Sequence, residues 1–489
     1  MSVAFARPTV PHPLVSVPSR LLLALSLVPA CSSDAGEDPE QATETSSADT
    51  GDVPTTTADT ADETGAALVR PNWHEDIAPL VHGRCVGCHR DAGIAPFALT
   101  TYELASAFAP LMHDAVSAGD MPPWGALETD ECQPQHTWKD DTRLSDAEKQ
   151  LFADWVTAGT PEGDPADAAT LPEPPSLALA DPTMVLQNPA PFVVGGTKDS
   201  FVCVAIDPGL AEDVWITGVQ MVPDRTEVVH HVLMYVDPEA ASDDLIDADG
   251  TYPCQGFVSF DGAQQIGTWV PGAVPTETPP DIGFPMPAGS RIVLAYHYHP
   301  TGADVVDQSS VALRWTTTKP SVNAVMGLFG NGDGLEPGPG DANGVPEFKI
   351  PADVKGHTET MSIEIPDIVP PTQIFSLGTH MHYVGVDMRA WIERDGQELC
   401  LIQTPRWDFN WQRNYTVDAP YGAMPTVQGG DIVRIRCTYD NTTDNPALVR
   451  ALAEQGLDTP QPVALGEASL DEMCLMLFGL ATDLPLDML

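Results

Sequence analysis

The sequence reads Val228-Val229-His230-His231-Val232, then Ala295-Tyr296-His297-Tyr298-His299, then Thr379-His380-Met381-His382 and finally Asp471-Glu472-Met473-Cys474. Each histidine lies in a run rich in Val, Ile, Leu or Tyr, which predicts β-strands. Only 13 His occur in the chain, and these motifs hold six of them. Imidazoles and a thioether on a β-rich scaffold favour copper, because Cu(II) accepts imidazole and Cu(I) accepts methionine sulfur. A single histidine pair is more often structural, so the prediction rests on all four motifs together.

In this order the motifs resemble the copper type II, ascorbate-dependent monooxygenases, which include dopamine β-hydroxylase-like and peptidylglycine α-hydroxylating monooxygenase-like enzymes. The resemblance covers roughly residues 186–489 and extends to Cys437-Thr438-Tyr439. It implies two all-β domains of antiparallel, jelly-roll-type sandwich. It also implies an oxidoreductase that hydroxylates an sp³ C–H bond with O₂ and two electrons.

The resemblance further implies two coppers per chain and assigns their ligands. The electron-storing copper would be held by His230, His231 and His297. The oxygen-binding, catalytic copper would be held by His380, His382 and Met473. His299 lies on the same strand face as His297 and could be a spare ligand or a hydrogen-bonding neighbour, but His297 occupies the position that matches the family motif.

The substrate cannot be read in the same way. Peptide-amidating relatives hold a carboxylate with an arginine at the position of Gly378, and they carry Asn and Tyr at the positions of Leu475 and Leu477. The peptide-binding set is therefore missing, and amidation is not expected. The apolar replacements favour a neutral or apolar small molecule.

A second chemical signal lies near the N-terminus, in Cys85-Val86-Gly87-Cys88-His89. This spacing is the attachment signal for a c-type haem, with His89 as the proximal iron ligand. A disulfide or half of a zinc site are the alternatives, and the lack of a second nearby cysteine pair weakens the zinc reading. The surroundings predict helices over 73–81 and 102–118 and a third that starts at Leu144 with Ser145 as its N-cap. Together these features predict a small all-α cytochrome c-like domain.

The loop Gly119-Asp120-Met121-Pro122-Pro123-Trp124 offers Met121 as the sixth haem ligand. Its competitors are His82, His113 and His136. A haem here suggests an electron donor other than, or in addition to, ascorbate. The hypothesis is that the haem relays electrons to the copper of His230, His231 and His297.

The N-terminal residues predict export. Residues 21–30 form an apolar run that is too short to span a bilayer and is typical of a signal peptide. Cys31 follows directly, as in a bacterial lipoprotein signal, although ordinary secretion is the alternative. We therefore expect a periplasmic protein, an outer-membrane lipoprotein or a secreted protein, with the membrane reached only through a lipid on Cys31.

Composition and linkers complete the predicted organisation. With 22 Lys+Arg against 70 Asp+Glu, the net charge of −48 argues against nucleic acid or anionic membranes as partners. The predicted parts are a signal peptide (1–31), a disordered acidic linker (32–67), the cytochrome c-like domain (68–165), a Pro-rich linker (166–185) and two copper monooxygenase domains (186–320 and 321–489).

The nine cysteines fit an exported protein. Removing Cys31, Cys85 and Cys88 leaves six for disulfides. The resemblance implies the pair Cys437–Cys474, and we expect Cys203–Cys254 because both lie early in the first copper domain. Cys132 and Cys400 then lie in different predicted domains and are expected to stay unpaired.

Other function classes remain open at this stage. The main alternative is an extracytoplasmic electron-transfer or copper-binding protein without oxygenase activity. No Gly-x-Ser-x-Gly or phosphate-binding loop supports a serine hydrolase or a nucleotide enzyme.

Overall fold

The computed structural model describes residues 70–483 except 92, 272, 339 and 469. The signal peptide, Cys31 and the acidic linker lie outside these residues. The described residues all belong to one unit of the chain, which spans 67–489. The predicted division of this part into domains stays a prediction.

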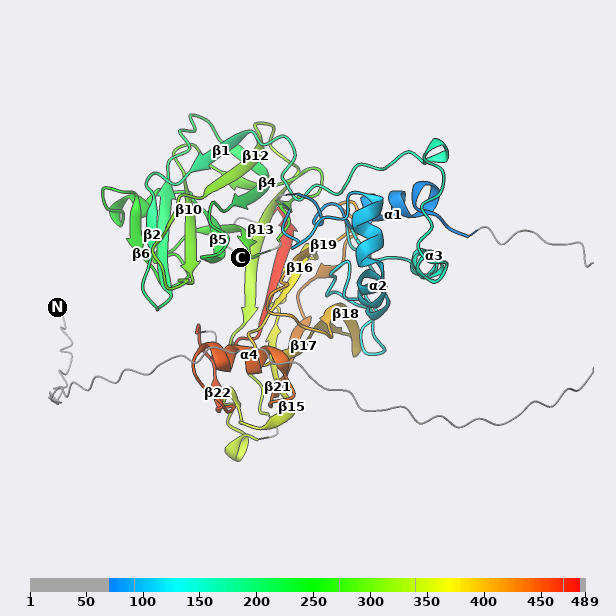
Figure 1. The fold of residues 1–489 in the computed structure, drawn as a ribbon. Coiled ribbons are helices and arrows are strands. Elements are labelled where there is room, and N and C mark those ends of the chain that lie inside the picture. The colour runs from blue at the N-terminus through cyan, green and yellow to red at the C-terminus, as the bar shows by residue number, and fades with distance from the viewer. Residues whose placement is uncertain (1–69, 92, 272, 339, 469, 484–489) are drawn as a thin grey trace, which may run out of the picture. The chain divides into compact units, whose positions relative to one another are not determined.

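The N-terminal described segment is helical, as expected (Figure 1). A π-helical turn η1 (Trp73–Ile77) continues into α1 (Ala78–Arg84), three residues past the predicted end. Helix α2 (Tyr102–Ala118) begins at its Thr101 cap and has the predicted bounds. Helix α3 (Asp146–Thr157) follows a capping box in which Ser145 and Glu148 satisfy each other's backbone N–H groups. A small core that includes Trp73, Ile77, Phe152 and Trp155 holds these helices together.

The rest of the described chain is mostly β-sheet, in agreement with the predicted all-β part. The largest sheet has the pairing order β1 (Met184–Gln187), β12 (Ser310–Thr316), β4 (Val214–Val222), β9 (Ile282–Met286), β13 (Val322–Gly330), β23 (Leu475–Thr482), β16 (Thr372–His380) and β19 (Asn414–Thr416), with β8 (Thr276–Glu277) beside β4 and β20 (Thr426–Val427) beside β16. A five-stranded sheet has the order β6 (Thr251–Pro253), β3 (Ser200–Ile206), β10 (Arg291–Tyr298), β5 (Val229–Asp237) and β7 (Gln264–Trp269). A four-stranded sheet has the order β15 (Val354–Glu364), β21 (Ile432–Asn441), β17 (Gly385–Arg394) and β18 (Gln397–Thr404).

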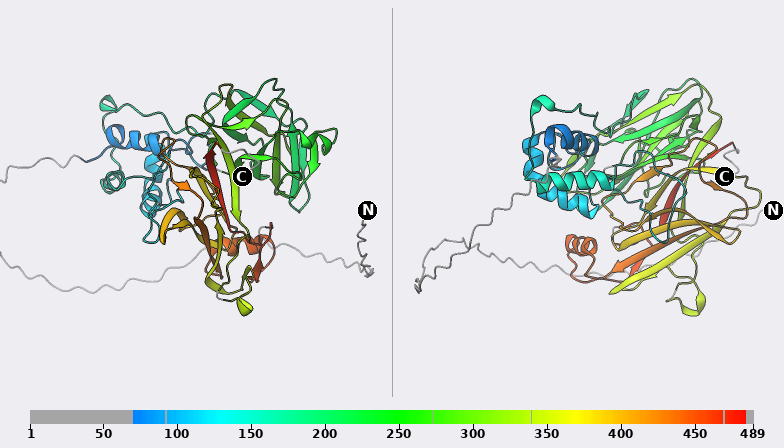
Figure 2. Two further views of the ribbon diagram at one scale, coloured as in Figure 1. Left: turned by 180° about the vertical axis from the view of Figure 1, so that it is seen from behind. Right: turned by 90° about the vertical axis from the view of Figure 1, so that its right-hand side faces the viewer.

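Shorter elements complete the fold. Two further pairs join β2 (Phe192–Val194) to β11 (Val305–Asp307) and β14 (Lys349–Ile350) to β22 (Val463–Ala464). The remaining helical pieces are η2 (Pro165–Asp167), η3 (Ala241–Asp244), η4 (Ala342–Gly344) and α4 (Pro446–Glu454). The different orientations of the sheets are visible in the two views of Figure 2.

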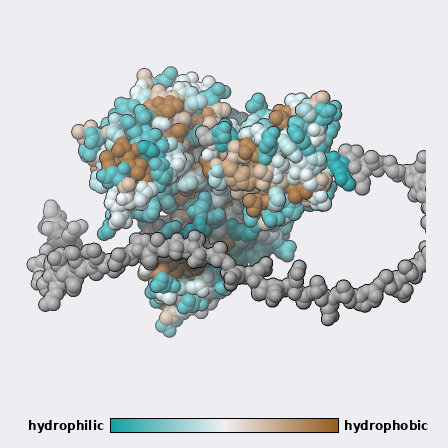
Figure 3. Space-filling model, in the orientation of Figure 1, coloured by the Kyte–Doolittle hydropathy of each residue, from teal (hydrophilic) through white to brown (hydrophobic). Residues whose placement is uncertain are grey.

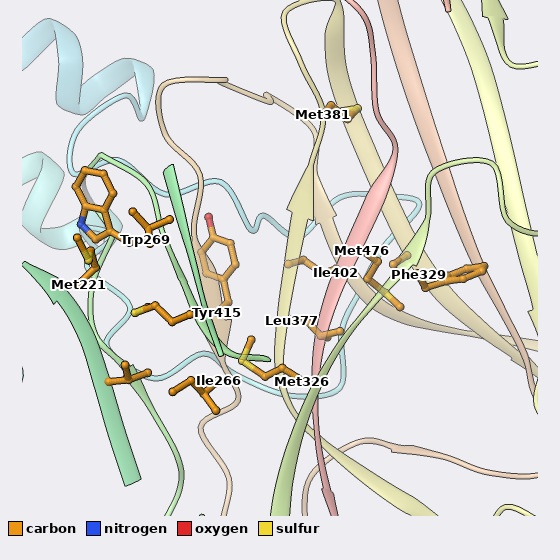
Figure 4. Close-up of a cluster of buried hydrophobic side chains, with 14 of the residues drawn as sticks. Met221, Ile266, Trp269, Met326, Phe329, Leu377, Met381, Ile402, Tyr415 and Met476 are labelled. Carbon is orange, nitrogen blue, oxygen red and sulfur yellow. The ribbon is translucent and has the colours of Figure 1, made fainter. Parts of the chain in front are cut away.

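The sheets pack because their strands bury one face. Strand β21 alternates between buried and partly exposed residues along most of its length, which is the pattern of a sheet with one face in a core. Residues of several sheets share one continuous apolar cluster, in which Ile266, Met326, Leu377 and Met476 lie close together (Figure 4). The β-rich segment before the predicted boundary at 320/321 is the first β-rich part, and the one after it is the second. These two β-rich parts are therefore joined through a common core.

Backbone pairing also joins these two parts. Strand β13 begins just after the predicted boundary at 320/321 and pairs in parallel with β9 through Val322–Ile282 and Asn323–Gly283. The same strand pairs with β23 over most of its length. This arrangement fixes the first β-rich part against the second.

The surface is broken up by polar residues. On the face drawn in Figure 3, hydrophobic residues form separate patches among hydrophilic ones. Within residues 70–483, no helix is long and apolar enough to cross a membrane.

Candidate metal centre

The first histidine group lies where β5 and β10 pair. In their antiparallel register His231 stands opposite His297, and a bulge follows between His297 and Tyr298. The Nδ1 atoms of His230 and His231 are 3.1 Å apart. One ring nitrogen from each of His230, His231 and His297 lies within 4.8 Å of the other two. Three imidazoles at this spacing suit a borderline metal such as copper.

Asp199, the residue before β3, orients this group. Its Oδ2 lies 2.8 Å from Nε2 of His297 and its Oδ1 lies 2.8 Å from Nδ1 of His299. Nδ1 of His297 is buried and has no hydrogen-bond partner among the described residues. A metal bound to that nitrogen would satisfy it, and carboxylates commonly hold metal-binding histidines from behind. His299 stays outside the group, with a side chain that is 63% exposed against 4% for His297.

Burial keeps the imidazoles of His230 and His231 neutral. It lowers the pKa of His230 to about 3, with a smaller contribution from His297, and it lowers the pKa of His231 well below its ordinary value. A neutral imidazole has a lone pair for a metal at neutral pH. These two histidines can therefore bind a cation without first losing a proton.

The second histidine pair lies at the end of β16. The rings of His380 and His382 are 5.2 Å apart. Nδ1 of His380 lies 2.7 Å from Oε1 of Gln412, and Nδ1 of His382 lies 3.1 Å from the backbone oxygen of Asp471. Because each oxygen accepts a hydrogen bond from Nδ1–H, each ring keeps Nε2 for a metal. Burial lowers the pKa of both histidines, that of His382 to about 3.

Met473 reaches the same end of the sheet. Strand β23 pairs with β16 so that Leu475 stands opposite His380, and Met473 precedes Leu475 by two residues. Met473 is buried, and its neighbour Cys474 forms a disulfide with Cys437. The disulfide fixes the segment that carries the thioether.

Glu472 connects this segment to the second histidine pair. Its fully buried carboxylate accepts hydrogen bonds from four backbone N–H groups, those of His382 (2.5 Å), Met473 (2.7 Å), Gly385 (3.0 Å) and Val384 (3.2 Å). Burial raises the pKa of Glu472, and the four N–H groups act in the opposite direction. Because each oxygen accepts two N–H groups, this arrangement requires the ionised carboxylate. Glu472 therefore holds the His382 loop and the Met473 segment together.

All six predicted metal ligands line one cavity. It occupies about 1260 Å³, counting its open mouth, and its lining includes His230, His231, His297, His380, His382 and Met473. Phe409 also lines it and lies between the two histidine groups, with its ring 5.4 Å from that of His230 and 5.9 Å from that of His382. The two groups therefore face a common space.

The predicted haem-attachment motif, with Cys85, Cys88 and His89, lies on the turn that follows α1. The thiols of Cys85 and Cys88 are free, whereas all other described cysteines form disulfides. Nδ1 of His89 lies 3.1 Å from the backbone oxygen of Phe97, which leaves Nε2 for an iron. These donors fit a c-type haem, and burial raises the pKa of the Cys85 thiol to about 12. Met121 lies in the loop after α2 with 43% of its surface exposed, and its role as sixth ligand stays a prediction.

The disulfides contradict one of the predictions from the sequence. The structure contains the pairs Cys437–Cys474 and Cys203–Cys254, which the sequence analysis proposes. It also joins Cys132 to Cys400, which were expected to stay unpaired because they lie 268 residues apart in different predicted domains. The loop 119–143 folds against the second β-rich part, and this brings the two cysteines together.

Several hydrogen bonds fix that loop. The backbone N–H of Gly125 donates to the hydroxyl of Tyr415 at 2.9 Å, and the N–H of Leu127 donates to the carbonyl of Gln403 at 3.0 Å. Trp138 forms a β-bridge with Val417. The helical segment is thus attached to strands β18 and β19 and to the segment that follows β19 (Figure 1).

Sequence reasoning missed four residues that shape the site, namely Asp199, Phe409, Gln412 and Glu472. All four contact a histidine that is distant in sequence, so no local spacing reveals these contacts. Glu472 belongs to the Met473 motif in the sequence, but its four acceptor contacts depend on the tertiary fold.

Comparisons with known proteins agree with the second histidine pair. Residues 346–479 match the model of the copper type II ascorbate-dependent monooxygenase, C-terminal domain. This segment contains His380, His382 and Met473, and the match supports the resemblance to a copper-dependent oxidoreductase family. No curated protein matches the chain.

Comparison with solved structures finds weak likenesses. The major capsid protein P2 from bacteriophage PM2 is 11% identical, with a TM-score of 0.26, over 58% of this chain and 97% of that chain. The structure of the recombinant peptide: N-glycanase F (PNGase F) is 10% identical, with a TM-score of 0.26, over 62% of this chain and 96% of that chain. Likenesses this weak carry no argument about fold or function.

Proposed function

We propose that this protein is a copper-dependent monooxygenase that hydroxylates an sp³ C–H bond with O₂. The observation that carries the proposal is that His230, His231, His297, His380, His382 and Met473 line one cavity. The family match over residues 346–479 supports it independently. Copper bound to these residues would supply O₂ activation and electron storage.

The chain's own residues contribute binding and orientation. Asp199 and Gln412 fix the rings of His297 and His380, and Glu472 holds the His382 loop. Such outer contacts commonly change metal affinity about 10- to 100-fold when they are removed. A haem on Cys85 and Cys88, with His89 as iron ligand, would supply electrons from an external donor.

The cavity walls favour a neutral or apolar substrate. Phe257, Leu328, Phe375, Leu475 and Leu477 all line the cavity. Apolar walls with a few polar groups are typical of small-molecule sites.

The position of Gly378 adds to this preference. A Cβ at Gly378 would collide with the side-chain amide of Asn414, its partner across strands β16 and β19. A side chain at this position would require Asn414 to move, and this chain has glycine where peptide-amidating relatives carry the arginine.

Disulfides and the family match favour a location outside the cytoplasm. We include in the proposal an N-terminal lipid anchor on Cys31, with secretion without an anchor as the alternative.

The test compares Met473→Leu with the matched control Met476→Leu in mature, copper-loaded protein. Met476 is buried on the same strand segment but does not line the cavity. Loss of the thioether should reduce ascorbate-driven O₂ uptake about 100-fold or more, whereas Met476→Leu should stay near the wild-type rate. Equal rates in both variants, or no copper-dependent uptake in the wild type, would leave a copper-binding or electron-transfer protein instead.

A further inference from the structure

Three polar side chains on one wall of the cavity leave their hydrogen-bonding groups unused. They are Ser376 on β16 and Asn414 and Thr416 on β19, and all three belong to the cavity lining. Within the described part of the chain, these side chains make no hydrogen bond. A few polar groups on an otherwise apolar wall are the ones that orient a bound small molecule.

Strand pairing gathers these side chains on one face. In the antiparallel register Ser376 stands opposite Thr416, and Asn414 lies two positions from Thr416 along the same strand. Successive side chains of a strand point to opposite faces, and the intervening Leu377 and Tyr415 are buried in the apolar core (Figure 4). The three polar side chains therefore face the cavity together and form what we call the polar strip.

Gly378 leaves the space that the amide of Asn414 occupies. The two residues stand opposite each other across β16 and β19, and a Cβ on the glycine would meet Oδ1 of the asparagine. On the other side of Gly378 the next strands place Leu477 and then Leu328 in the same row. Both leucines line the cavity. The amide thus stands at the end of an apolar row of the sheet.

Other polar side chains of the lining differ because the fold already uses them. The hydroxyls of Thr379 and Thr404 bond to each other at 3.1 Å. The Gln412 amide donates from Nε2 to the backbone oxygen of Phe409 at 2.9 Å, and its Oε1 accepts from Nδ1 of His380. These groups position parts of the site, whereas those of the polar strip stay open to the cavity.

The polar strip is uncharged, and the charged residues of the lining have other surroundings. Glu277 is ion-paired with Arg314 at 2.8 Å, and Glu467 is exposed. Arg413 packs its guanidinium over the ring of Trp124 at 4.8 Å. An amide and two hydroxyls both donate and accept hydrogen bonds. They suit a neutral polar group, because an ion that leaves water without an opposite charge is strongly disfavoured.

We propose that Asn414, with the hydroxyls of Ser376 and Thr416, binds a neutral hydrogen-bonding group of the substrate, such as an amide, a carbonyl or a hydroxyl. The inference deepens the proposed function and rests on it. Gly378 precedes His380 by two residues, so the row of Asn414 lies about 7 Å along β16 from that histidine. A substrate held by its polar end would lay its apolar part along the leucine row and present a C–H bond to the second histidine pair.

The experiment measures by calorimetry how hexanamide, hexanoate and hexylammonium bind the mature, copper-free full chain, in which no probe can coordinate a metal. The wild type should bind hexanamide about tenfold more tightly than either ion. Asn414→Leu should weaken hexanamide binding about tenfold, because one hydrogen-bonding partner is lost. Asn410→Leu is the matched control and should bind like the wild type, since Asn410 bonds to Asp408 and does not line the cavity.

A charged variant gives a gain of binding that misfolding cannot imitate. Asn414→Asp places a carboxylate in the polar strip and should reverse the preference, so that hexylammonium binds about tenfold more tightly than hexanamide. An unreversed preference in this variant would overturn the proposal, as would equal hexanamide affinity in Asn414→Leu and the wild type.

Two further outcomes separate this inference from other assignments. Hexanoate that is the tightest probe for the wild type and no longer binds Arg413→Gln would assign substrate recognition to the guanidinium and overturn the proposal. Hexanamide selectivity that depends on Asn414, in a protein whose copper-loaded form shows no copper-dependent O₂ uptake, would support the binding site and sink the monooxygenase function instead.

Discussion

Replacing Glu472 tests how the chain builds its second metal site. Each carboxylate oxygen accepts two backbone N–H groups: Oε2 those of His382 and Met473, and Oε1 those of Val384 and Gly385. In Glu472→Gln, one oxygen is replaced by an NH₂ group that faces two N–H donors. Two buried N–H groups then lose their acceptor, at about 1–3 kcal/mol each.

The expected result is a loss of both stability and copper affinity. We expect the free energy of unfolding to fall by about 2–6 kcal/mol because two buried donors are left unpaired. Copper affinity at the His380–His382–Met473 site should fall about 10- to 100-fold, as for other groups that position metal ligands. Copper binding at the first histidine group should not change.

The assay combines thermal unfolding with copper titration against a competing chelator. Glu359→Gln is the matched control, because Glu359 is also a buried carboxylate in the second β-rich part but contacts His357 and the N–H of Lys349. The control should lower stability without weakening copper binding. If Glu472→Gln binds the second copper as tightly as the wild type, the positioning role of Glu472 is refuted.

Two further predictions address the other contacts. Asp199→Ala removes the acceptor that orients His297 and should weaken copper binding at the first histidine group about 10- to 100-fold. His299→Ala should leave that binding unchanged. Copper titration against a competing chelator checks both variants, and equal effects would contradict the assignment of His297. The double substitution of Cys132 and Cys400 by Ser should lower the free energy of unfolding by about 2–5 kcal/mol because it releases a long loop in the unfolded chain; unchanged denaturant unfolding would show that the disulfide contributes nothing.

The sequence predicts much of the local structure because local signals specify it. The capping box at Ser145 and Glu148 places the start of α3, and the predicted helix over 102–118 agrees with the bounds of α2. The runs around His231 and His297 predict strands, which the structure confirms. Strand register then brings these two histidines opposite each other.

The remaining parts of the site depend on long-range packing. Asp199 meets His297 across 98 positions of the sequence, and Glu472 meets His382 across 90. The pairing of Cys132 with Cys400 requires the loop 119–143 to lie on another part of the chain, which no periodicity predicts. Phe409 stands between the two histidine groups only because the sheets that carry them share a core.

The most direct test of the central claim is a combined measurement on mature protein produced with haem c maturation and excess copper. Copper content, the reduced haem spectrum and ascorbate-driven O₂ uptake would be determined on the same sample. The account predicts two coppers per chain, a c-type haem band and O₂ uptake that disappears when copper is removed. A copper-replete preparation that binds no copper, or one whose O₂ uptake is unaffected by copper removal, would contradict it.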